Sequence, residues 1–148
     1  MIRCVKQTIF EPPTGNCLAA CVASLFNRPL WTVPNFAALD CWYQSGCQWK
    51  RRSTTEIPRW WTSMGDFARS EGWRVLQLSN LARGTWAGHF TRGDVGIATV
   101  GKGNNDHCVL ADLVTGEVVW DPHPQGWQEG HQLAHDDVHD WILFLALK

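Results

Sequence analysis

The order of the hydrophobic patterns along the chain limits its fold more strongly than any other feature. Apolar residues at helical spacing dominate the first half, and short strand-like patterns dominate the second half. Helices that come first and strands that come later are typical of an α+β fold, in which helices pack on an antiparallel sheet. We therefore predict an α+β protein with N-terminal helices packed on an antiparallel β-sheet.

Three segments of the first half are predicted to be helical. Apolar residues recur at helical spacing between a proline-glycine turn and a second proline, which predicts a helix over residues 16–26. A similar apolar stripe, which ends at Gly72, predicts a helix over residues 57–71. A shorter helix interrupted by Pro34 is predicted over residues 31–39, and residues 40–55 are predicted to form a long loop.

Five strands are predicted in the second half, over residues 73–78, 94–100, 107–113, 117–121 and 141–147. A three-residue loop over residues 114–116, with Gly116 in the left-handed conformation, places Leu113 opposite Glu117. The same register places Asp121 on the side of the sheet that carries His107, about 7 to 8 Å away along the backbone. A two-residue turn would instead place Asp121 on the opposite face.

Size and charge indicate one globular domain over residues 1–148, and they exclude some partners. The chain has 148 residues and a formal net charge of -1, and its longest basic run has three residues. Such a chain offers no surface that follows nucleic-acid phosphates, and no apolar stretch approaches the length of a membrane span. The expected location is the cytoplasm, where the six cysteines are expected to be free thiols. The sequence does not predict an oligomeric state.

Cys17 is the candidate nucleophile. It follows Gly15 and Asn16 directly, at the start of the first predicted helix. Unpaired backbone N–H groups and the helix dipole favour a thiolate at this place. Cys17 could instead be a small packed residue, as is expected of Cys21 one helical turn later. A general base near Cys17 would favour the catalytic interpretation.

His107 is the candidate base, and Asp121 is its candidate partner. His107 begins an apolar strand after a polar, glycine-containing segment, so its imidazole is expected at the edge of the sheet, where a base can meet a substrate. Asp121 ends the next strand, from which its carboxylate can orient the imidazole. A cysteine at a helix start, a histidine that begins a strand and an aspartate that ends the next strand occur in this order in papain-like cysteine peptidases.

Four short motifs resemble the peptidase domain of bacteriocin-exporting transporters, which is a compact branch of the papain-like fold. The resemblance implies a papain-like domain that hydrolyses a peptide or related amide or acyl bond, without a cofactor or metal, in a peptide or protein substrate. The motifs are Val5-Lys6-Gln7, Gly15-Asn16-Cys17-Leu18-Ala19-Ala20-Cys21, Asp106-His107-Cys108-Val109-Leu110 and Trp120-Asp121-Pro122-His123-Pro124.

The resemblance also implies a role for each site residue. Cys17 would be the nucleophile, His107 the base and Asp121 the residue that orients the base. The side-chain amide of Gln7 and the backbone N–H of Cys17 would bind the oxyanion. Gln7 precedes Cys17 by ten residues, which is longer than usual in the family, so the segment around Pro12 and Pro13 must fold away the excess. Asn16 is the alternative oxyanion donor.

Two other functions remain open from the sequence. The stretched spacing between Gln7 and Cys17 also suits a catalytically degenerate papain-like module that binds a peptide without cleaving it. Separately, His131, His135 and His139 would align on one side of a helix and could form the zinc site of a hydrolase, although the segment has few apolar residues to hold a helix.

The chain contains ten tryptophans, and most are expected in the core. Those predicted in loops could line a cleft for an extended peptide or a glycan, because an indole offers an apolar face and one donor. The loop tryptophans are Trp42, Trp49, Trp86 and Trp127.

Overall fold

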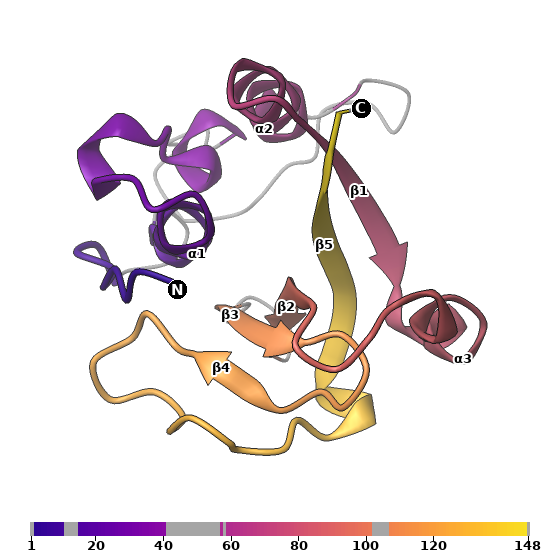
Figure 1. Ribbon diagram of the computed structural model, residues 1–148. Coiled ribbons are helices and arrows are strands. Elements are labelled where there is room, and N and C mark those ends of the chain that lie inside the picture. The colour runs from indigo at the N-terminus through magenta and orange to yellow at the C-terminus, as the bar shows by residue number, and fades with distance from the viewer. Residues whose placement is uncertain (1, 11–14, 41–56, 58, 102–106, 148) are drawn as a thin grey trace.

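The computed structural model describes residues 2–10, 15–40, 57, 59–101 and 107–147 (Figure 1). The α-helices are α1 (Cys17–Leu25), α2 (Arg59–Ser70) and α3 (Arg83–Trp86). The strands are β1 (Trp73–Ser79), β2 (Val95–Val100), β3 (His107–Asp112), β4 (Val118–Trp120) and β5 (Val138–Ala146). Short 3₁₀ helices are η1 (Leu30–Thr32), η2 (Phe36–Asp40), η3 (Asn80–Ala82), η4 (Ala87–His89) and η5 (His135–Asp137).

The five strands form one sheet in the order β1-β5-β2-β3-β4, and every neighbouring pair is antiparallel. This arrangement confirms the predicted α+β class. The C-terminal strand β5 lies between β1 and β2. It therefore connects β1 to the strands β2, β3 and β4, of which β3 carries His107. All five strands occur where the alternation predicts them, and β5 begins three residues earlier than predicted, at Val138.

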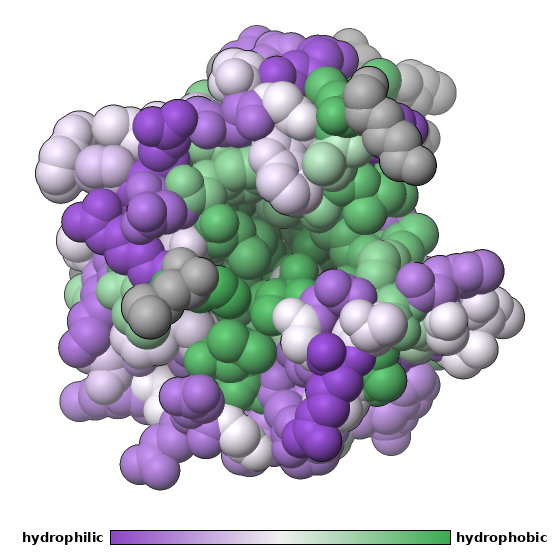
Figure 2. All heavy atoms as spheres, in the orientation of Figure 1, coloured by the Kyte–Doolittle hydropathy of each residue, from purple (hydrophilic) through white to green (hydrophobic). Residues whose placement is uncertain are grey.

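Apolar side chains form a separate core on each face of the sheet. On one face, Val22 of α1 and Met64 of α2 pack in a cluster that includes Ile97, Leu110 and Ile142 of the strands. The cluster on the other face includes Trp86 of α3 and Leu133 together with alternate strand residues. Figure 1 shows α1 and α2 on one side of the sheet and α3 beyond β1. Figure 2 shows hydrophobic side chains gathered in a central hollow on the side of the molecule that it draws, with hydrophilic side chains around them.

The first half differs from the predicted helices in detail. The helix predicted over residues 31–39 is replaced by two 3₁₀ helices, η1 and η2, on either side of Pro34. Proline lacks an N–H donor and disfavours helical backbone in the residue before it, so one continuous helix cannot form there. The predicted loop over residues 40–55 lies outside the described residues, except for Asp40 at the end of η2. The short helices around α3 have no counterpart among the predictions.

The hairpin that joins β3 to β4 has a longer loop than predicted. Asp112, rather than Leu113, lies opposite Glu117, with a hydrogen bond of 2.9 Å from the Asp112 N–H to the Glu117 carbonyl. The Asp112 carboxylate causes this, because its Oδ1 accepts the N–H groups of Val114 and Thr115 at 2.9 and 2.7 Å. Gly116 adopts the expected positive φ of 77°.

A register shift between Leu110 and Ala111 then restores the predicted pairing farther along the hairpin. Ala111 pairs with Val118, whereas Leu110 pairs with Trp120, so β4 carries one extra residue at this point. The pair Leu110 and Trp120 belongs to the predicted register. Asp121 consequently reaches the side of His107, as predicted, although the loop that leads there is different.

Across the described parts of the chain, no helix is both long enough and apolar enough to cross a membrane.

Candidate active site

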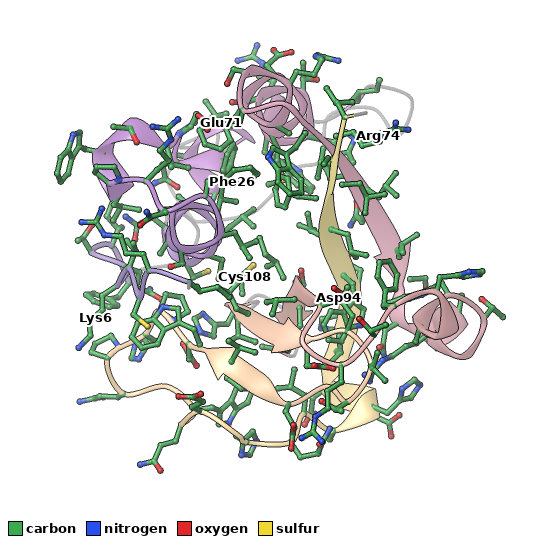
Figure 3. The ribbon with its side chains drawn as sticks, in the orientation of Figure 1. Lys6, Phe26, Glu71, Arg74, Asp94 and Cys108 are labelled. Atoms are coloured by element: carbon green, nitrogen blue, oxygen red, sulfur yellow. The ribbon has the colours of Figure 1, made fainter. Side chains whose placement is uncertain are left out.

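Cys17 is the first residue of α1, and α1 lies against the start of β3. One helical turn after Cys17, the Cys21 thiol donates a hydrogen bond to the carbonyl of Cys108, with 3.4 Å between the sulfur and the oxygen. Figure 3 shows Cys108 between α1 and the sheet. Because residues four apart share one side of a helix, Cys17 also faces β3, next to His107 and Cys108.

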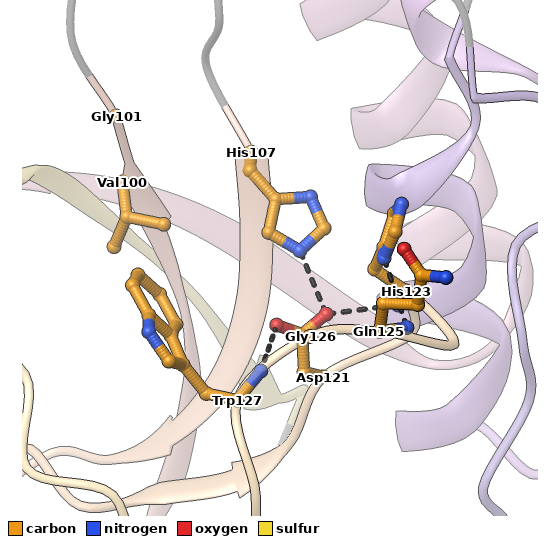
Figure 4. Close-up of a pocket in the computed structure, with 8 residues that line it drawn as sticks. All are labelled: Val100, Gly101, His107, Asp121, His123, Gln125, Gly126 and Trp127. Atoms are coloured by element: carbon orange, nitrogen blue, oxygen red, sulfur yellow. Dashed lines mark hydrogen bonds and ion pairs between the residues drawn. The ribbon is translucent and has the colours of Figure 1, made fainter.

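Asp121 holds the imidazole of His107 by one ring nitrogen. His107 Nε2 lies 2.7 Å from Asp121 Oδ1, and the Asp121 side chain is only 3% exposed (Figure 4). The Asp121 carboxylate is itself fixed, because it accepts the backbone N–H groups of His123 at 2.8 Å and Trp127 at 3.0 Å. The other ring nitrogen, Nδ1, points away from Asp121 (Figure 4), and His107 also makes a hydrogen bond with the Cys17 thiol.

The surroundings of Cys17 favour its ionised form. A hydrogen bond from the Cys108 thiol lowers the pKa of Cys17 most, burial raises it, and the hydrogen bond and charge of His107 lower it further. The result is a pKa of about 5. Burial, helped by the charge of Cys17, raises the pKa of Cys21 well above the usual value for a thiol. The hydrogen bond with Cys17, together with burial, likewise raises the pKa of Cys108.

The surroundings of His107 favour its protonated form. Burial lowers the pKa of His107, but the hydrogen bonds with Asp121 and Cys17 and their negative charges outweigh burial and raise this pKa to about 9. For Asp121, burial raises the pKa, but its hydrogen bonds and the charge of His107 outweigh burial and bring this pKa below the usual value. The lowered pKa of Cys17 and the raised pKa of His107 both favour a Cys17 thiolate beside a His107 imidazolium.

Gln7 is 6% exposed and lies beside the turn that follows Asp121. Its backbone N–H donates to the carbonyl of Pro122, next to Asp121, at 3.1 Å. Its side-chain Nε2 donates one hydrogen bond, to the Ile9 carbonyl at 3.1 Å, and its Oε1 is buried without a hydrogen-bond partner among the described residues. An amide nitrogen carries two hydrogens, so Nε2 keeps a second donor.

Asn16, the alternative oxyanion donor, turns its side chain toward residues 8 and 9. Its Nδ2 donates to Thr8 Oγ1 at 3.0 Å, and its Oδ1 accepts the backbone N–H of Thr8 at 2.9 Å. The backbone N–H of Asn16 donates to the Ile9 carbonyl at 3.1 Å. These bonds join residues 8 and 9 to the start of α1. Residues 9 and 16 therefore lie side by side despite their separation in the sequence. The segment 11–14, which includes both prolines, lies outside the described residues.

A pocket of about 370 Å³ opens beside the pair of His107 and Asp121. Trp127 forms one wall, and its indole stacks on the His131 ring with 5.2 Å between centroids and an interplanar angle of 6°. Trp127 thus lines a pocket, as predicted, whereas the same prediction for Trp86 is wrong. Trp86 lies in the core, because α3 packs its indole against Trp141 and the sheet. Trp42 and Trp49 lie outside the described residues.

The three histidines proposed for a zinc site do not line up on a helix. His131 stacks on Trp127, His135 begins η5 and interacts with Asn80, and His139 lies in β5. The segment has too few apolar residues to hold a helix against the core, so it forms a turn and the start of a strand. Within the residues that the structure describes, no three His, Cys, Asp or Glu side chains are grouped so that they could hold a metal ion.

Two features of the site were not predicted from the sequence. The first is the contact between the thiols of Cys17 and Cys108, which the adjacency of His107 and Cys108 in the sequence could have suggested. The second is Gly126, which packs so closely on Asp121 that a Cβ at position 126 would overlap the carboxylate. A glycine in the turn directly after Asp121 is the only sequence signal for this contact.

No protein-family model, curated protein or solved structure matches this chain.

Proposed function

We propose that the protein is a thiol hydrolase of the cysteine peptidase type, which cleaves a peptide or related amide or acyl bond. One observation carries this proposal: the Cys17 thiol makes a hydrogen bond with His107, whose Nε2 lies 2.7 Å from the buried carboxylate of Asp121. A packed structural cysteine needs neither a base nor a residue that orients the base. A nucleophilic cysteine needs both.

In the first step, the Cys17 thiolate attacks the carbonyl carbon of the substrate, and the carbonyl oxygen becomes an oxyanion. The second Nε2 hydrogen of Gln7 and the backbone N–H of Cys17 donate to this oxyanion. As the oxyanion collapses, the bond to the leaving group breaks, and His107 gives its proton to the departing nitrogen or oxygen. The substrate acyl group remains on Cys17 as a thioester.

In the second step, water hydrolyses the thioester. Neutral His107 takes a proton from water, the resulting hydroxide attacks the thioester carbonyl, and the Cys17 thiolate leaves with its electron pair. Asp121 keeps the imidazole oriented through both steps and stabilises the imidazolium. The proposed reaction uses groups of this chain and water.

We also assign the chain to the papain-like fold. The order of the site supports this assignment, since Cys17 begins a helix, His107 begins a strand of an antiparallel sheet and Asp121 follows the next strand. The closure between residues 8–9 and Asn16 supports it too, because Gln7 bonds to Pro122, next to Asp121, despite the long spacing to Cys17. The long spacing, from which the alternative of a binding module is inferred, is thus compatible with a catalytic site as well.

The proposal is tested by incubating the purified protein with a peptide library and identifying products by mass spectrometry. We expect cleavage by the wild type and by Cys4→Ala and His89→Ala, which change an exposed thiol and an exposed histidine of η4 that have no role in the proposed reaction. Cys17→Ala and His107→Ala should not cleave. Cleavage that persists in Cys17→Ala would contradict the proposal. Peptide binding without cleavage would favour the binding module.

A further inference from the structure

The N-terminal segment, residues 5–9, lies between α1 and the turn that holds Asp121. Val5 bonds to both sides, since its N–H donates to Ser24 Oγ of α1 at 3.0 Å and its carbonyl accepts from Trp120 Nε1 at 3.2 Å. Farther along, the Gln7 N–H donates to the Pro122 carbonyl at 3.1 Å. The segment is thus joined to the elements that carry both the nucleophile and the aspartate.

Asn16 makes the densest set of hydrogen bonds to this segment. Its Oδ1 accepts the backbone N–H groups of Thr8 at 2.9 Å and Ile9 at 3.0 Å, and its Nδ2 donates to Thr8 Oγ1 at 3.0 Å. Its backbone N–H adds a bond to the Ile9 carbonyl at 3.1 Å. Asn16 is 5% exposed, so water competes little for these bonds.

Helix capping does not explain this use of Asn16. An asparagine at the N-cap position ordinarily accepts an N–H from the first turn of its own helix. Asn16 occupies the N-cap of α1, yet its side chain makes no such bond and turns back toward residues 8 and 9. The first-turn N–H groups of α1, that of Cys17 included, are therefore not capped by this side chain.

The Ile9 carbonyl connects Asn16 to Gln7. This carbonyl accepts both the backbone N–H of Asn16 and the side-chain Nε2 of Gln7, each at 3.1 Å. The bond to Ile9 uses one Nε2 hydrogen of Gln7, and in doing so it sets the direction of the other. Asn16 bonds to both the N–H and the carbonyl of Ile9, so it fixes the acceptor that orients the Gln7 amide.

We propose that Asn16 is a positioning residue that holds the Gln7 amide in place to bind the oxyanion. This inference rests on the proposed function, in which Gln7 is an oxyanion donor. The predicted consequence is specific: loss of the Asn16 side chain weakens the steps that form an oxyanion and leaves the reactivity of the Cys17 thiolate unchanged.

Two small reagents separate these effects without knowledge of the natural substrate. Iodoacetamide alkylates Cys17 at a saturated carbon, where no oxyanion forms, so its rate reports the folded thiolate. p-Nitrophenyl acetate acylates Cys17 through a tetrahedral oxyanion, so its rate also depends on the oxyanion donors. The ratio of the acylation rate to the alkylation rate therefore measures oxyanion stabilisation.

The experiment measures this ratio for the wild type, Gln7→Ala, Asn16→Ala and the double variant. Gln7→Ala should lower the ratio by about 100-fold, as expected for the loss of one oxyanion donor. Asn16→Ala should lower it by about 10-fold or more, because a donor displaced by about 1 Å loses most of its effect. The double variant should resemble Gln7→Ala, since Asn16 acts only through Gln7.

Two further variants keep the result decisive. Asn16→Asp keeps the acceptor for both backbone N–H groups and should restore most of the ratio. If Asn16→Ala loses alkylation as well as acylation, the exposed Thr8→Val, which removes only the Oγ1 acceptor, should still lower the ratio by about twofold.

The outcomes distinguish the two claims. A wild-type ratio in Gln7→Ala would overturn the role of Gln7 in the proposed function, and the inference with it. A reduced ratio in Gln7→Ala with a wild-type ratio in both Asn16→Ala and Thr8→Val would overturn the inference alone. Losses that multiply in the double variant would also overturn it, because Asn16 would then act independently of Gln7.

Discussion

The close packing of Gly126 on Asp121 leads to a sharp prediction for Gly126→Ala. A Cβ placed on Gly126 would lie 2.5 Å from Asp121 Oδ1 and closer still to Cγ, whereas real contacts of a Cβ start at about 3.0 Å. Gly126 does not have a positive φ, so alanine fits its backbone, and the three atoms nearest to an added Cβ all belong to the Asp121 carboxylate. Oδ1 must therefore move by at least about 0.5 Å, which disturbs its bond of 2.7 Å to His107.

The size of the effect follows from this hydrogen bond. A hydrogen bond to a charged group contributes about 1.5 to 3 kcal/mol, and one pH unit corresponds to about 1.4 kcal/mol. Weakening the bond should lower the pKa of His107, which is about 9, by about one to two units. Acylation of Cys17 by p-nitrophenyl acetate should slow by about 10-fold to 100-fold, because the base loses the group that orients it.

NMR titration of the His107 ring measures the first effect, and acylation kinetics measure the second. Gly65→Ala is the matched control, because Gly65 lies in α2 and an added Cβ there would meet no atom within 4 Å, so both quantities should stay at wild-type values. The opposite result would be a Gly126→Ala variant that keeps the wild-type titration of His107 and the wild-type rate. The backbone around residue 126 would then have moved in place of the Asp121 carboxylate, and the reasoning would be refuted.

Three further predictions concern pH, selectivity and stability. The hydrolysis rate should rise through about pH 5, as Cys17 loses its proton. It should fall through about pH 9, as His107 loses the proton that it gives to the leaving group. A rate that lacks either the rise or the fall would contradict the ion pair. Iodoacetamide at about pH 6 should label Cys17 before any other thiol, with the buried Cys21 and Cys108 unlabelled in peptide maps, and His107→Ala should slow this labelling. Phe26→Ala removes a ring that packs edge-on against three others and should lower the free energy of unfolding by about 3 kcal/mol in urea denaturation; a loss below about 1 kcal/mol would contradict that packing.

The sequence predicts well where local chemistry decides the structure. The helical spacing after Gly15 places Cys17 at the start of a helix, and the alternation around His107 and Asp121 gives two neighbouring strands. Pro34 predicts an interruption, and the structure there has two 3₁₀ helices. At these positions, the spacing of apolar residues and the backbone preferences of single residues are sufficient to predict the secondary structure.

The sequence predicts poorly where one polar side chain selects among several partners. The Asp112 carboxylate lengthens the hairpin loop by accepting two backbone N–H groups. The number of residues between the strands does not predict these hydrogen bonds, so the predicted loop length is wrong. Similarly, Asn16 is predicted as the alternative oxyanion donor, but its side chain bonds to residues 8 and 9 instead. Trp86 is predicted in a loop because its helix is only four residues long.

The ionisation of Cys17 tests the central claim most directly. The ultraviolet absorbance of the thiolate, titrated in the wild type and corrected by subtraction of Cys17→Ser, gives the pKa of this one thiol. The contacts with Cys108 and His107 predict a midpoint near pH 5. A midpoint at about pH 8.5, the value of an ordinary thiol, would contradict the thiolate and imidazolium pair on which the proposed hydrolase depends.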